Sequence, residues 1–526
     1  MTLGNVSLIE SAPLGPVPLT EVAVLLHPDD DVAIAKVALQ TGTVLAFDGQ
    51  QIAVQQFISS GHKVALRAID AGAVVRRYGQ AIGFAEQAIA PGEHVHTHNL
   101  SVGALTLDYQ FGVDVVPVDF VPENQRRTFM GYKRADGRVA TRNYIAVIAT
   151  VNCSAHTVRK IAHHFTPEHL ADYPNVDGVL AIAHGSGCGM ALNGADHDIL
   201  QRLLGGYAKH VNVGAYVIVG LGCEINQGST LIDDMHLASN GHRPPFLTLQ
   251  DTGGIRKTTE AGIAAVEALL PEVNTIGRTP QPVSEIMLAL QCGGSDGWSG
   301  VTANPALGMV VDEIVRQGGT AVLAETPEVY GAEHLLTRRA SSRAIGEKLV
   351  ERIHWWEDHT KRLDIEIDNN PSVGNKVGGL TTIYEKSLGA VAKGGTTPLM
   401  GVYRYGDPVT ARGFTFMDTP GYDPVSATGQ VAGGCNLMVF TTGRGSCFGF
   451  KPAPSIKVAS NSTMFNRMEE DMDVNAGKIL EGVPMQAVAD ELFELVIAIA
   501  SGQQSKSEAQ DVGEEEFTPW SLGGTL

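Results

Sequence analysis

Cysteine is scarce in this sequence: there are six in 526 residues, spread from Cys153 to Cys447, and none stands in a CxxC pair. So few and so dispersed thiols exclude a disulfide scaffold and argue against a zinc knuckle. The chain also lacks an apolar run of the ~20 residues that a membrane helix needs. Its start, MTLGNVSLIESAPLGP, lacks the basic and apolar regions of a signal peptide. We therefore expect a cytoplasmic protein whose cysteines are free thiols or metal ligands.

Positive charge is scarce as well, with 38 Lys and Arg against 57 Asp and Glu and a net charge of -19. This balance argues against nucleic acid or an anionic membrane as a partner. A site for an anion would need its own local cations, metal or helix N-termini. Neither a Walker motif nor a GxGxxG after a strand is present, so a nucleotide-dependent redox enzyme lacks support. Glycine, by contrast, is abundant at 60 residues, which indicates many tight turns or close backbone approaches.

The pattern along the chain predicts a multi-domain α/β protein. Residues 1–100 hold short β segments between glycine turns, which is typical of a small all-β clip. Residues 101–127 lose that pattern and form a first linker. Strand-length apolar runs then alternate with helical patterns in a middle domain, 128–272, and a C-terminal domain, 286–526, which predicts parallel sheets flanked by helices. A proline-rich second linker separates them at 273–285, and the acidic tail after Ser501 is expected to be mobile.

Residues capable of acid–base chemistry or metal binding follow the predicted parallel strands repeatedly. The strands are expected at 145–151, 179–183, 215–221, 286–290 and 321–324. Ligands of open α/β sheets bind outside the carboxyl ends of the strands. The residues found at these ends are Cys153, His184, Cys188, Cys223, Cys292, Asp296 and Glu325.

Several glycine-rich loops could bind an anion or a metal. The stretch LQCGGSDGWSGVTANPALG at 290–308 is the richest, and residues 370–380 and 440–449 combine glycine with Lys376 or Arg444. The last two resemble backbone-plus-cation cradles for a carboxylate or phosphate. The HGSGCG loop at 184–189 could bind a metal or an anion, or be a plain turn. Cys435 and Cys447 are best interpreted as small hydrophobic residues.

Two histidine segments lie in the clip. His62 and Lys63 in SSGHKVAL form either a solvated pair or an acid–base pair presented to a neighbouring domain. In GEHVHTH, the alternation of His94, His96 and His98 could bind metal or face water, and we favour water.

The sequence resembles the galactarate/altronate dehydratase family along nearly its whole length, and looks most like altronate dehydratases. Besides the stretch at 290–308, the matching segments are SSGHKVAL, YGQAIGFA, YKRADGRVATRN, HGSGCG, VIVGLGCEINQ, AETPEVYGAEHLL, NPSVGNKVGGLTTIYEKSLG and FTTGRGSCFGF. The resemblance implies an antifreeze-like β-clip, a middle domain used for homodimerisation and a Rossmann-like C-terminal domain. It also implies iron, usually ferrous, with an iron–sulfur cluster or another divalent metal as alternatives.

The reaction implied is β-elimination of water from an aldonate such as D-altronate, giving a 2-keto-3-deoxy acid, with galactarate as the alternative substrate. Removing a proton next to a carboxylate concentrates negative charge, which a metal can stabilise. On this basis the expected catalytic residues are His62, Lys63, Asp296, Lys376 and Arg444. The expected substrate-binding residues are Gly293, Gly294, Ser295, Asn304, Asn375 and Gly445.

The metal could be held in two ways. Cys292 and Glu325 form one expected ligand set at the C-terminal sheet. Cys153, His184, Cys188 and Cys223 form a second, in which three thiolates would suit an aconitase-like cluster with one open iron; mononuclear iron held by carboxylate and imidazole is the rival. A protein that binds a sugar acid without converting it is the competing interpretation. No nucleic acid or membrane partner is expected.

Overall fold

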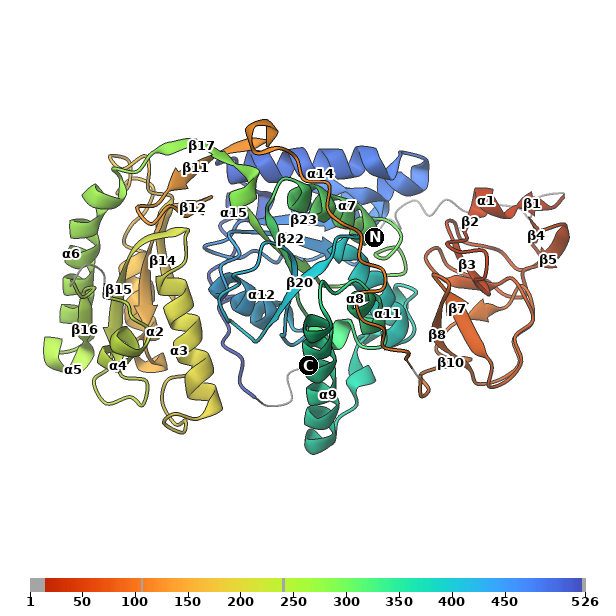
Figure 1. The fold of residues 1–526 in the computed structure, drawn as a ribbon, viewed down its shortest axis with the longest axis horizontal. Coiled ribbons are helices and arrows are strands. Elements are labelled where there is room, and N and C mark those ends of the chain that lie inside the picture. Colours follow the sequence, from red (N-terminus) through yellow and green to blue (C-terminus); the bar gives the residue numbers. More distant parts are fainter. Residues whose placement is uncertain (1–14, 106, 239–241, 523–526) are drawn as a thin grey trace, which may run out of the picture.

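The structure is a computed structural model that describes residues 15–105, 107–238 and 242–522. The N-terminal segment in which we expected no signal peptide lies mostly outside these residues. Three domains lie in a row, with the C-terminal domain between the other two (Figure 1). No helix among the described residues is long and apolar enough to cross a membrane.

The N-terminal domain is β-rich, as predicted. Its strands form three small sheets, in the orders β1-β4-β5, β10-β8-β7 and β2-β3-β6-β9. Apart from one helical turn, α1 (Leu19–Val22), the elements are β1 (Val17–Pro18), β2 (Ala23–Val24), β3 (Val32–Ala35), β4 (Val44–Phe47), β5 (Gln50–Ala53), β6 (Lys63–Ala65), β7 (Val74–Arg77), β8 (Gln80–Ala85), β9 (His94–Val95) and β10 (Leu100–Ser101).

The first predicted linker is a strap bound to the C-terminal domain. Residues 102–127 contain no strand among those described, and they run over the surface toward the middle domain (Figure 1). Asp114 pairs with Arg338 at 2.5 Å, and the amide of Val121 donates to the carbonyl of Arg316 at 2.8 Å. The segment is therefore extended but held in place.

The second predicted linker is wrong in part, because it contains a strand. β17 (Arg278–Pro282) pairs antiparallel with β11 (Thr128–Lys133), which also pairs with β12 (Val139–Ala140). The order β12-β11-β17 puts β17 at an edge. Proline has no amide hydrogen to donate, but an edge strand tolerates it, so the prolines did not prevent a strand.

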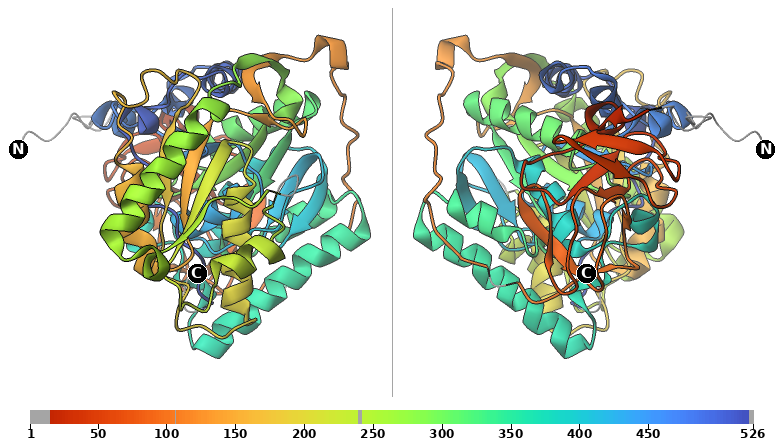
Figure 2. Two further views of the ribbon diagram at one scale, coloured as in Figure 1. Left: turned by 90° about the vertical axis from the view of Figure 1, so that its left-hand side faces the viewer. Right: turned by 90° about the vertical axis from the view of Figure 1, so that its right-hand side faces the viewer.

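The middle domain has a parallel sheet in the order β14-β13-β15-β16. Its strands are β13 (Tyr144–Ala149), β14 (Gly178–Ile182), β15 (Val213–Gly220) and β16 (Phe246–Thr248). Helices α2 (Asn152–Ala162) and α6 (Ile255–Val273) pack on one face and α3 (Ala195–Ala208) on the other, next to the C-terminal domain (Figure 2). Alternate residues of β13 enter the two cores, as strand geometry requires.

The C-terminal domain has a seven-stranded parallel sheet in the order β20-β21-β19-β18-β22-β23-β24. The chain winds outward from β18 through β19 in one direction and through β22 in the other. Such a reversal opens a crevice at the carboxyl ends of the two strands. The strands are β18 (Met287–Cys292), β19 (Thr320–Leu323), β20 (Leu399–Tyr403), β21 (Gly413–Met417), β22 (Leu437–Thr442), β23 (Ser455–Ala459) and β24 (Val474–Asn475).

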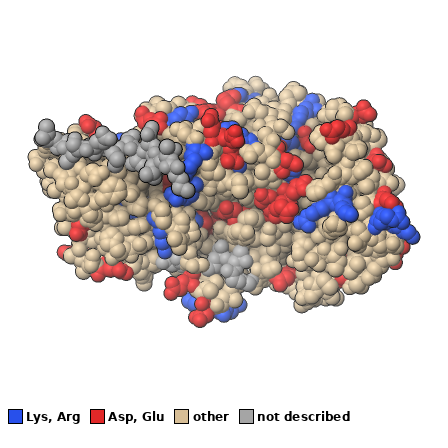
Figure 3. Space-filling model, turned by 180° about the vertical axis from the view of Figure 1, so that it is seen from behind, with Lys and Arg blue, Asp and Glu red and all other residues tan. Residues whose placement is uncertain are grey.

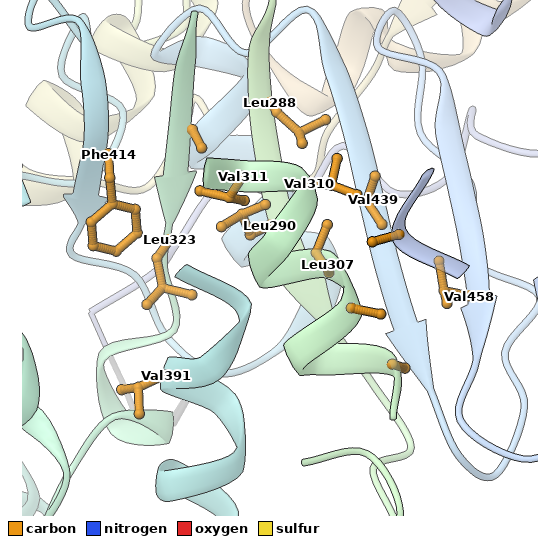
Figure 4. Close-up of a cluster of buried hydrophobic side chains, with 14 of the residues drawn as sticks. Leu288, Leu290, Leu307, Val310, Val311, Leu323, Val391, Phe414, Val439 and Val458 are labelled. Carbon is orange, nitrogen blue, oxygen red and sulfur yellow. The ribbon is translucent and has the colours of Figure 1, made fainter. Parts of the chain in front are cut away.

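Helix α7 (Ala303–Arg316) covers one face of this sheet (Figure 4). Leu307 and Val310 of the helix lie against Leu288 and Leu290 of β18 and Val439 of β22, all of them buried. Each such side chain contributes about 1.5–3 kcal/mol when fully buried. The remaining helices of the chain are α4 (Gly228–Asp234), α5 (Leu249–Thr252), α8 (Glu333–Arg338), α9 (Arg343–Leu363), α10 (Val373–Val377), α11 (Ile383–Val391), α12 (Asp423–Ala432), α13 (Ser462–Arg467), α14 (Met485–Ala500) and α15 (Lys506–Ala509).

The tail that we expected to be mobile is packed instead. Glu508 pairs with the nearly buried Arg142 at 2.7 Å, and Trp520 stacks on Trp356 with ring centroids 5.5 Å apart. The ring of Phe517 meets Tyr207 edge-on. The acidic composition suggested a solvated end, but two aromatic anchors and one buried ion pair hold it against the molecule.

Acidic side chains are spread over the face seen in Figure 3, and basic ones occur in small patches among them. This distribution agrees with the net charge of -19.

Candidate active site

The glycines after β18 allow two loops to meet at the reversal of the sheet. Gly294 has a left-handed backbone, with φ of 62°, and its carbonyl accepts from the amide of Arg444 at 2.8 Å. A Cβ on Gly293 would lie 2.3 Å from a carboxylate oxygen of Asp423. The backbone at 293–294 is therefore approached by the loop after β22 and by an acidic side chain.

A buried group of five side chains lies at the carboxyl ends of β18 and β19, and we call it the thiol–carboxylate–lysine centre. Its members are Cys292, Glu325, Glu328, Lys386 and Lys393. The Cys292 sulfur lies 3.6 Å from Glu325 and 3.3 Å from Glu328. Lys393 pairs with Glu325 at 2.8 Å and Lys386 pairs with Glu328 at 2.6 Å. Two lysines thus compensate two carboxylates.

Burial brings the pKa of one member of this centre, Glu325, close to neutral pH. It raises the pKa of Glu325 to about 7, although Lys393 acts in the opposite direction. Burial opposes ionisation of Glu328 too, but Lys386 and Lys393 outweigh it and lower that pKa. Burial also raises the pKa of the Cys292 thiol far above its usual range. The adjacent Asp423, raised to a pKa of about 8 by burial and by the two glutamates, is expected to hold a proton at pH 7.

Both the backbone conformation and the burial of Glu325 cost free energy. Its backbone is left-handed, with φ of 67° and ψ of 63°, which costs a residue with a side chain about 1–3 kcal/mol. Its Oε1 atom is buried without a hydrogen-bond partner, and leaving a buried polar atom unsatisfied costs about 1–3 kcal/mol. Strain of this kind persists where function requires it, so Oε1 is the atom best placed to meet a substrate, proton or metal.

A second centre lies in the clip, where His62, His94 and His96 face one another; we call it the imidazole centre. One nitrogen of each ring lies within 4.8 Å of the others, and His62 Nδ1 is 3.0 Å from His94 Nε2. The row facing water that we favoured is therefore not what the structure contains. β9 ends after Val95, so the chain turns and His96 joins the group.

The imidazole centre fits a divalent metal. Burial is the main cause that lowers the pKa of His94 to about 3, and the neighbouring imidazoles add to it. Burial is also the main cause that lowers the pKa of His96 to about 4, and the charge of Lys63 adds to it. Neutral imidazoles have a lone pair to donate. His96 Nδ1 is buried without a partner.

Residues 370–386 contact both centres. His62 Nε2 lies 3.2 Å from the carbonyl of Val377. At the other end, Asn370 donates to Glu328 at 2.8 Å and accepts from Lys386 at 2.7 Å. This one segment, running through α10 into α11, brings a clip histidine and the buried carboxylates to the same part of the C-terminal domain.

Two predicted cations remain available for an anion. Arg444 is exposed and Lys376 is half-buried, and neither forms an ion pair with any residue that the structure describes. A Cβ on Gly378 would lie 3.2 Å from Arg444 Cδ, which places this arginine against the loop that follows Lys376. The geometry suits binding of a carboxylate between the two loops.

Lys63 has a different environment from the one we expected. It is fully buried, donates to the Gly379 carbonyl at 2.7 Å and pairs with both carboxylate oxygens of Glu385 at 2.9 and 3.0 Å. Arg77 pairs with the same carboxylate at 2.5 Å. These contacts attach the clip to the C-terminal domain and leave Lys63 no free position toward a substrate.

Asp296 is likewise occupied within the protein. Its buried carboxylate accepts from the amides of Trp298 and Ser299 and from the side chains of Ser299, Ser460 and Asn461, at 2.8–3.0 Å. Five donors leave little capacity for a metal or a proton, although burial raises its pKa. The residue stabilises the glycine-rich turn.

Other predicted substrate-binding residues also hold loops together. Asn375 caps α10 and donates to the Ser295 carbonyl at 2.8 Å. The Asn304 side chain donates to the Gly389 carbonyl and accepts from Thr441. Gly445, with φ of 98°, completes the turn after β22. These residues position the backbone of the site.

The second expected metal set lies on the middle sheet, apart from these centres. Cys153, Cys188 and Cys223 are exposed. His184 is buried: its Nε2 is 2.9 Å from the carbonyl of Ala149, and its Nδ1 accepts from the Ser186 amide. Both ring nitrogens are in use, so we no longer include His184 among the ligands.

The sequence analysis missed Glu328, Lys386, Lys393 and Asp423. A signal was present in IYEKSLGAVAKGG, where two lysines seven residues apart stand among small and apolar residues. Seven residues are about two helical turns, so a helix would place both lysines on one face. Glu328 stands three residues after Glu325, which is one turn.

Comparison with known proteins identifies the family. Residues 21–103 match the altronate/galactarate dehydratase SAF domain, 131–274 match the second domain of D-galactarate dehydratase/altronate hydrolase, and 283–525 match the C-terminal domain of D-galactarate/altronate dehydratase.

Curated relatives agree with these matches. The altronate dehydratase of Escherichia coli (strain K12) is 35% identical over 490 residues, which cover 93% of this chain and 97% of the relative. That of Bacillus subtilis (strain 168) is 35% identical over 506 residues, covering 95% and 99%. The galactarate dehydratase (L-threo-forming) of Escherichia coli (strain K12) is 35% identical over 494 residues, covering 92% and 94%. The resemblance seen in the sequence is confirmed, and the chain belongs to the D-galactarate/altronate dehydratase family.

Proposed function

We propose that this chain is a sugar-acid dehydratase that removes water from D-altronate, with galactarate as the alternative substrate. The C2 proton and the C3 hydroxyl leave as water, and the enol that remains ketonises to a 2-keto-3-deoxy acid. The observation that carries the proposal is the buried, unpartnered Glu325 carboxylate oxygen in a chain that aligns with named dehydratases over nearly its whole length.

Lys376 and Arg444 bind the substrate carboxylate in this proposal. Both are cations without an ion-pair partner among the described residues, and they flank the glycine-rich loop. An acid-rich chain needs such local cations to hold an anionic substrate.

Glu325 removes the C2 proton. A base acts best when its pKa lies near the working pH, and burial raises the pKa of Glu325 to about 7. Lys393, 2.8 Å away, stabilises the carboxylate before the transfer. We therefore assign Glu325 to proton transfer instead of the metal binding expected from the sequence.

Asp423 supplies the proton for the departing C3 hydroxyl. Hydroxide is a poor leaving group and requires an acid. With its pKa raised to about 8, Asp423 holds a proton at pH 7, and its carboxylate lies next to Gly293.

The metal implied by the family would be held by His62, His94 and His96. Imidazole is a suitable ligand for divalent iron, and His96 Nδ1 has no hydrogen-bond partner within the protein. When bound, the ion would polarise a carboxylate or hydroxyl oxygen of the substrate. Cys292, Glu325 and Glu328 are also close enough to hold an ion, but two lysines already compensate those carboxylates. Ferrous iron is the first candidate and another divalent metal the second.

The proposal extends to the organisation of the protein. Parallel strands that wind outward from β18 in both directions support a Rossmann-like description of the C-terminal domain. The match to a SAF domain supports an antifreeze-like clip. We further propose a cytoplasmic homodimer joined through the middle domain, with the sugar acid as its small-molecule partner.

An anaerobic screen of aldonates and aldarates with added ferrous iron tests the function. We expect a 2-keto-3-deoxy product from D-altronate, and none from the Glu325→Gln variant. The matched control is Glu260→Gln, which changes an exposed glutamate on α6 in another domain. Binding of D-altronate without product in the metal-loaded wild type would favour a non-catalytic binding protein.

Metal content separates the two possible ligand groups. The expected result is that His94→Ala loses the iron that is not accompanied by acid-labile sulfide, whereas Cys292→Ser keeps it. The opposite pattern would move the metal to the thiol–carboxylate–lysine centre.

A further inference from the structure

Three exposed cysteines lie at one edge of the middle sheet, on loops that follow three neighbouring strands. Cys153 begins α2 after β13, Cys188 lies in the loop after β14, and Cys223 follows β15. In the sheet, β13 lies between β14 and β15, and all three are parallel. Their carboxyl ends, and the cysteines with them, therefore lie at the same edge.

Backbone contacts join the first two loops. The amide of Asn152, next to Cys153, donates to the carbonyl of Ser186 at 2.8 Å. Gly187, next to Cys188, has φ of 100°, a conformation that favours glycine. The two cysteines thus lie one and two residues from a single hydrogen bond.

The third loop is joined to both of the others. Glu224, next to Cys223, accepts from the Thr150 hydroxyl at 2.7 Å. The amide of Asn226 donates to the carbonyl of Gly187 at 3.1 Å. Every cysteine is adjacent to a residue of this network, so the fold fixes the three loops together.

A second observation points to a missing ligand. The Oδ1 atom of Asn226 is buried in the network and has no hydrogen-bond partner. The thiols are weakly engaged: Cys223 accepts one hydrogen bond from Gln250 at 3.3 Å, and Cys153 lies 3.8 Å from its neighbour Asn152. The thiols are therefore accessible to a metal.

The spacing of the thiols argues against a single ion. Sulfurs 2.3 Å from one tetrahedral ion lie only about 3.8 Å apart. Among the described residues, groups of three ligand atoms within 4.8 Å of one another occur at two places, and these thiols are not one of them. A cluster does not need its thiolates that close together, because each of them binds a different metal atom.

We propose that Cys153, Cys188 and Cys223 bind an iron–sulfur cluster, each thiolate on a different iron. With three protein ligands, one iron of a four-iron cluster stays open at the surface. An open iron accepts oxygen ligands, and a 2-hydroxy carboxylate is the chemical class that offers two of them. This site goes beyond the proposed function, which places the metal of the reaction on the imidazole centre.

The test uses the full-length protein, purified without oxygen and reconstituted with ferrous iron and sulfide. Acid-labile sulfide, iron and visible absorbance are measured for the wild type, Cys153→Ser, Cys188→Ser and Cys223→Ser. The matched control is Cys447→Ser, because Cys447 is also exposed but lies in the C-terminal domain. Thermal unfolding by circular dichroism checks that each variant is folded.

We expect sulfide and visible absorbance in the wild type and in Cys447→Ser, and loss of both in the other three variants. Absence of sulfide from the reconstituted wild type would overturn the proposal, as would full sulfide content in a folded triple Cys→Ser variant. The His94→Ala variant separates this site from the proposed function: it is expected to lose dehydratase activity and keep its sulfide.

Discussion

Replacing Glu385 by glutamine should weaken the attachment of the clip more than any surface change. Glu385 is fully buried and faces two buried cations, Lys63 at 2.9 Å and Arg77 at 2.5 Å. Its carboxylate also accepts from the amide and hydroxyl of Thr381 at 2.9 and 2.6 Å. Glutamine keeps the size of the side chain but leaves both cations without a counter-charge.

The expected loss in free energy of unfolding follows from the burial of Glu385 and its two cations. Removing one partner of a buried ion pair costs about 3–5 kcal/mol, because the other charge stays buried and uncompensated. Burial opposes ionisation of Glu385, yet Lys63 and Arg77 outweigh it and lower the pKa to about 2. Lys63 can relieve part of the cost by losing its proton, since burial already lowers its pKa to about 8. We therefore expect about 3 kcal/mol.

Denaturant unfolding with a clip-specific probe measures this cost, and limited proteolysis within 102–127 reports release of the clip. The control is Glu260→Gln, because Glu260 and Arg256 form an exposed pair at 2.7 Å and such pairs contribute about 0–1 kcal/mol. If Glu385→Gln costs no more than this control, the ion pairs do not hold the clip and the reasoning fails.

Four further predictions follow from the same structure. Glu325→Gln should lower kcat at least ~100-fold, as expected on losing a general base, while leaving substrate binding measurable by calorimetry. In the wild type, product formation should rise with pH through about 7, because a base acts only when deprotonated and burial raises the pKa of Glu325 to that value; a profile flat from pH 6 to 8 would contradict the assignment. Gly294→Val should abolish turnover but keep the circular dichroism of the fold, since valine is strained at φ of 62° and its Cβ would lie 3.2 Å from the hydroxyl oxygen of Thr442; full activity would mean that the turn serves only the fold. Trp520→Ala should lower the free energy of unfolding by about 3–5 kcal/mol through loss of the stack on Trp356, and a change under 1 kcal/mol would show that the tail is not anchored there.

The sequence predicted the parallel sheets and the importance of their carboxyl ends, because both depend on local patterns. Apolar runs mark buried strands, and β3, which is buried throughout, begins and ends where its run does. Cys292 and Glu325 were found by a rule of chain direction: ligands bind where parallel strands end. That rule identifies the edge of the sheet where a ligand binds. It finds individual residues on that edge only when they follow a strand that the sequence reveals.

What the sequence could not predict is which polar side chains already have partners. Asp296 and Asn304 follow a strand just as Cys292 does, but five donors surround one and two neighbours hold the other. Lys386 and Lys393 lie in a helix and the turn after it, where lysine is ordinarily solvated; only the three-dimensional packing buries them against carboxylates. Such pairing joins residues 58 and 68 apart in the chain, so no local pattern records it.

The contacts that attach the clip to the C-terminal domain also position His62. Lys63 donates a hydrogen bond to the carbonyl of Gly379, and a ring nitrogen of its neighbour His62 lies 3.2 Å from the carbonyl of Val377. His62 directly precedes β6, so two adjacent clip residues hold two carbonyls of one segment of the C-terminal domain. The buried ion pair of Lys63 therefore fixes the position of the imidazole centre relative to residues 370–386. A change that loosens this contact should move the histidines away from the carboxylates before it unfolds either domain, and for that reason activity should be lost earlier than structure.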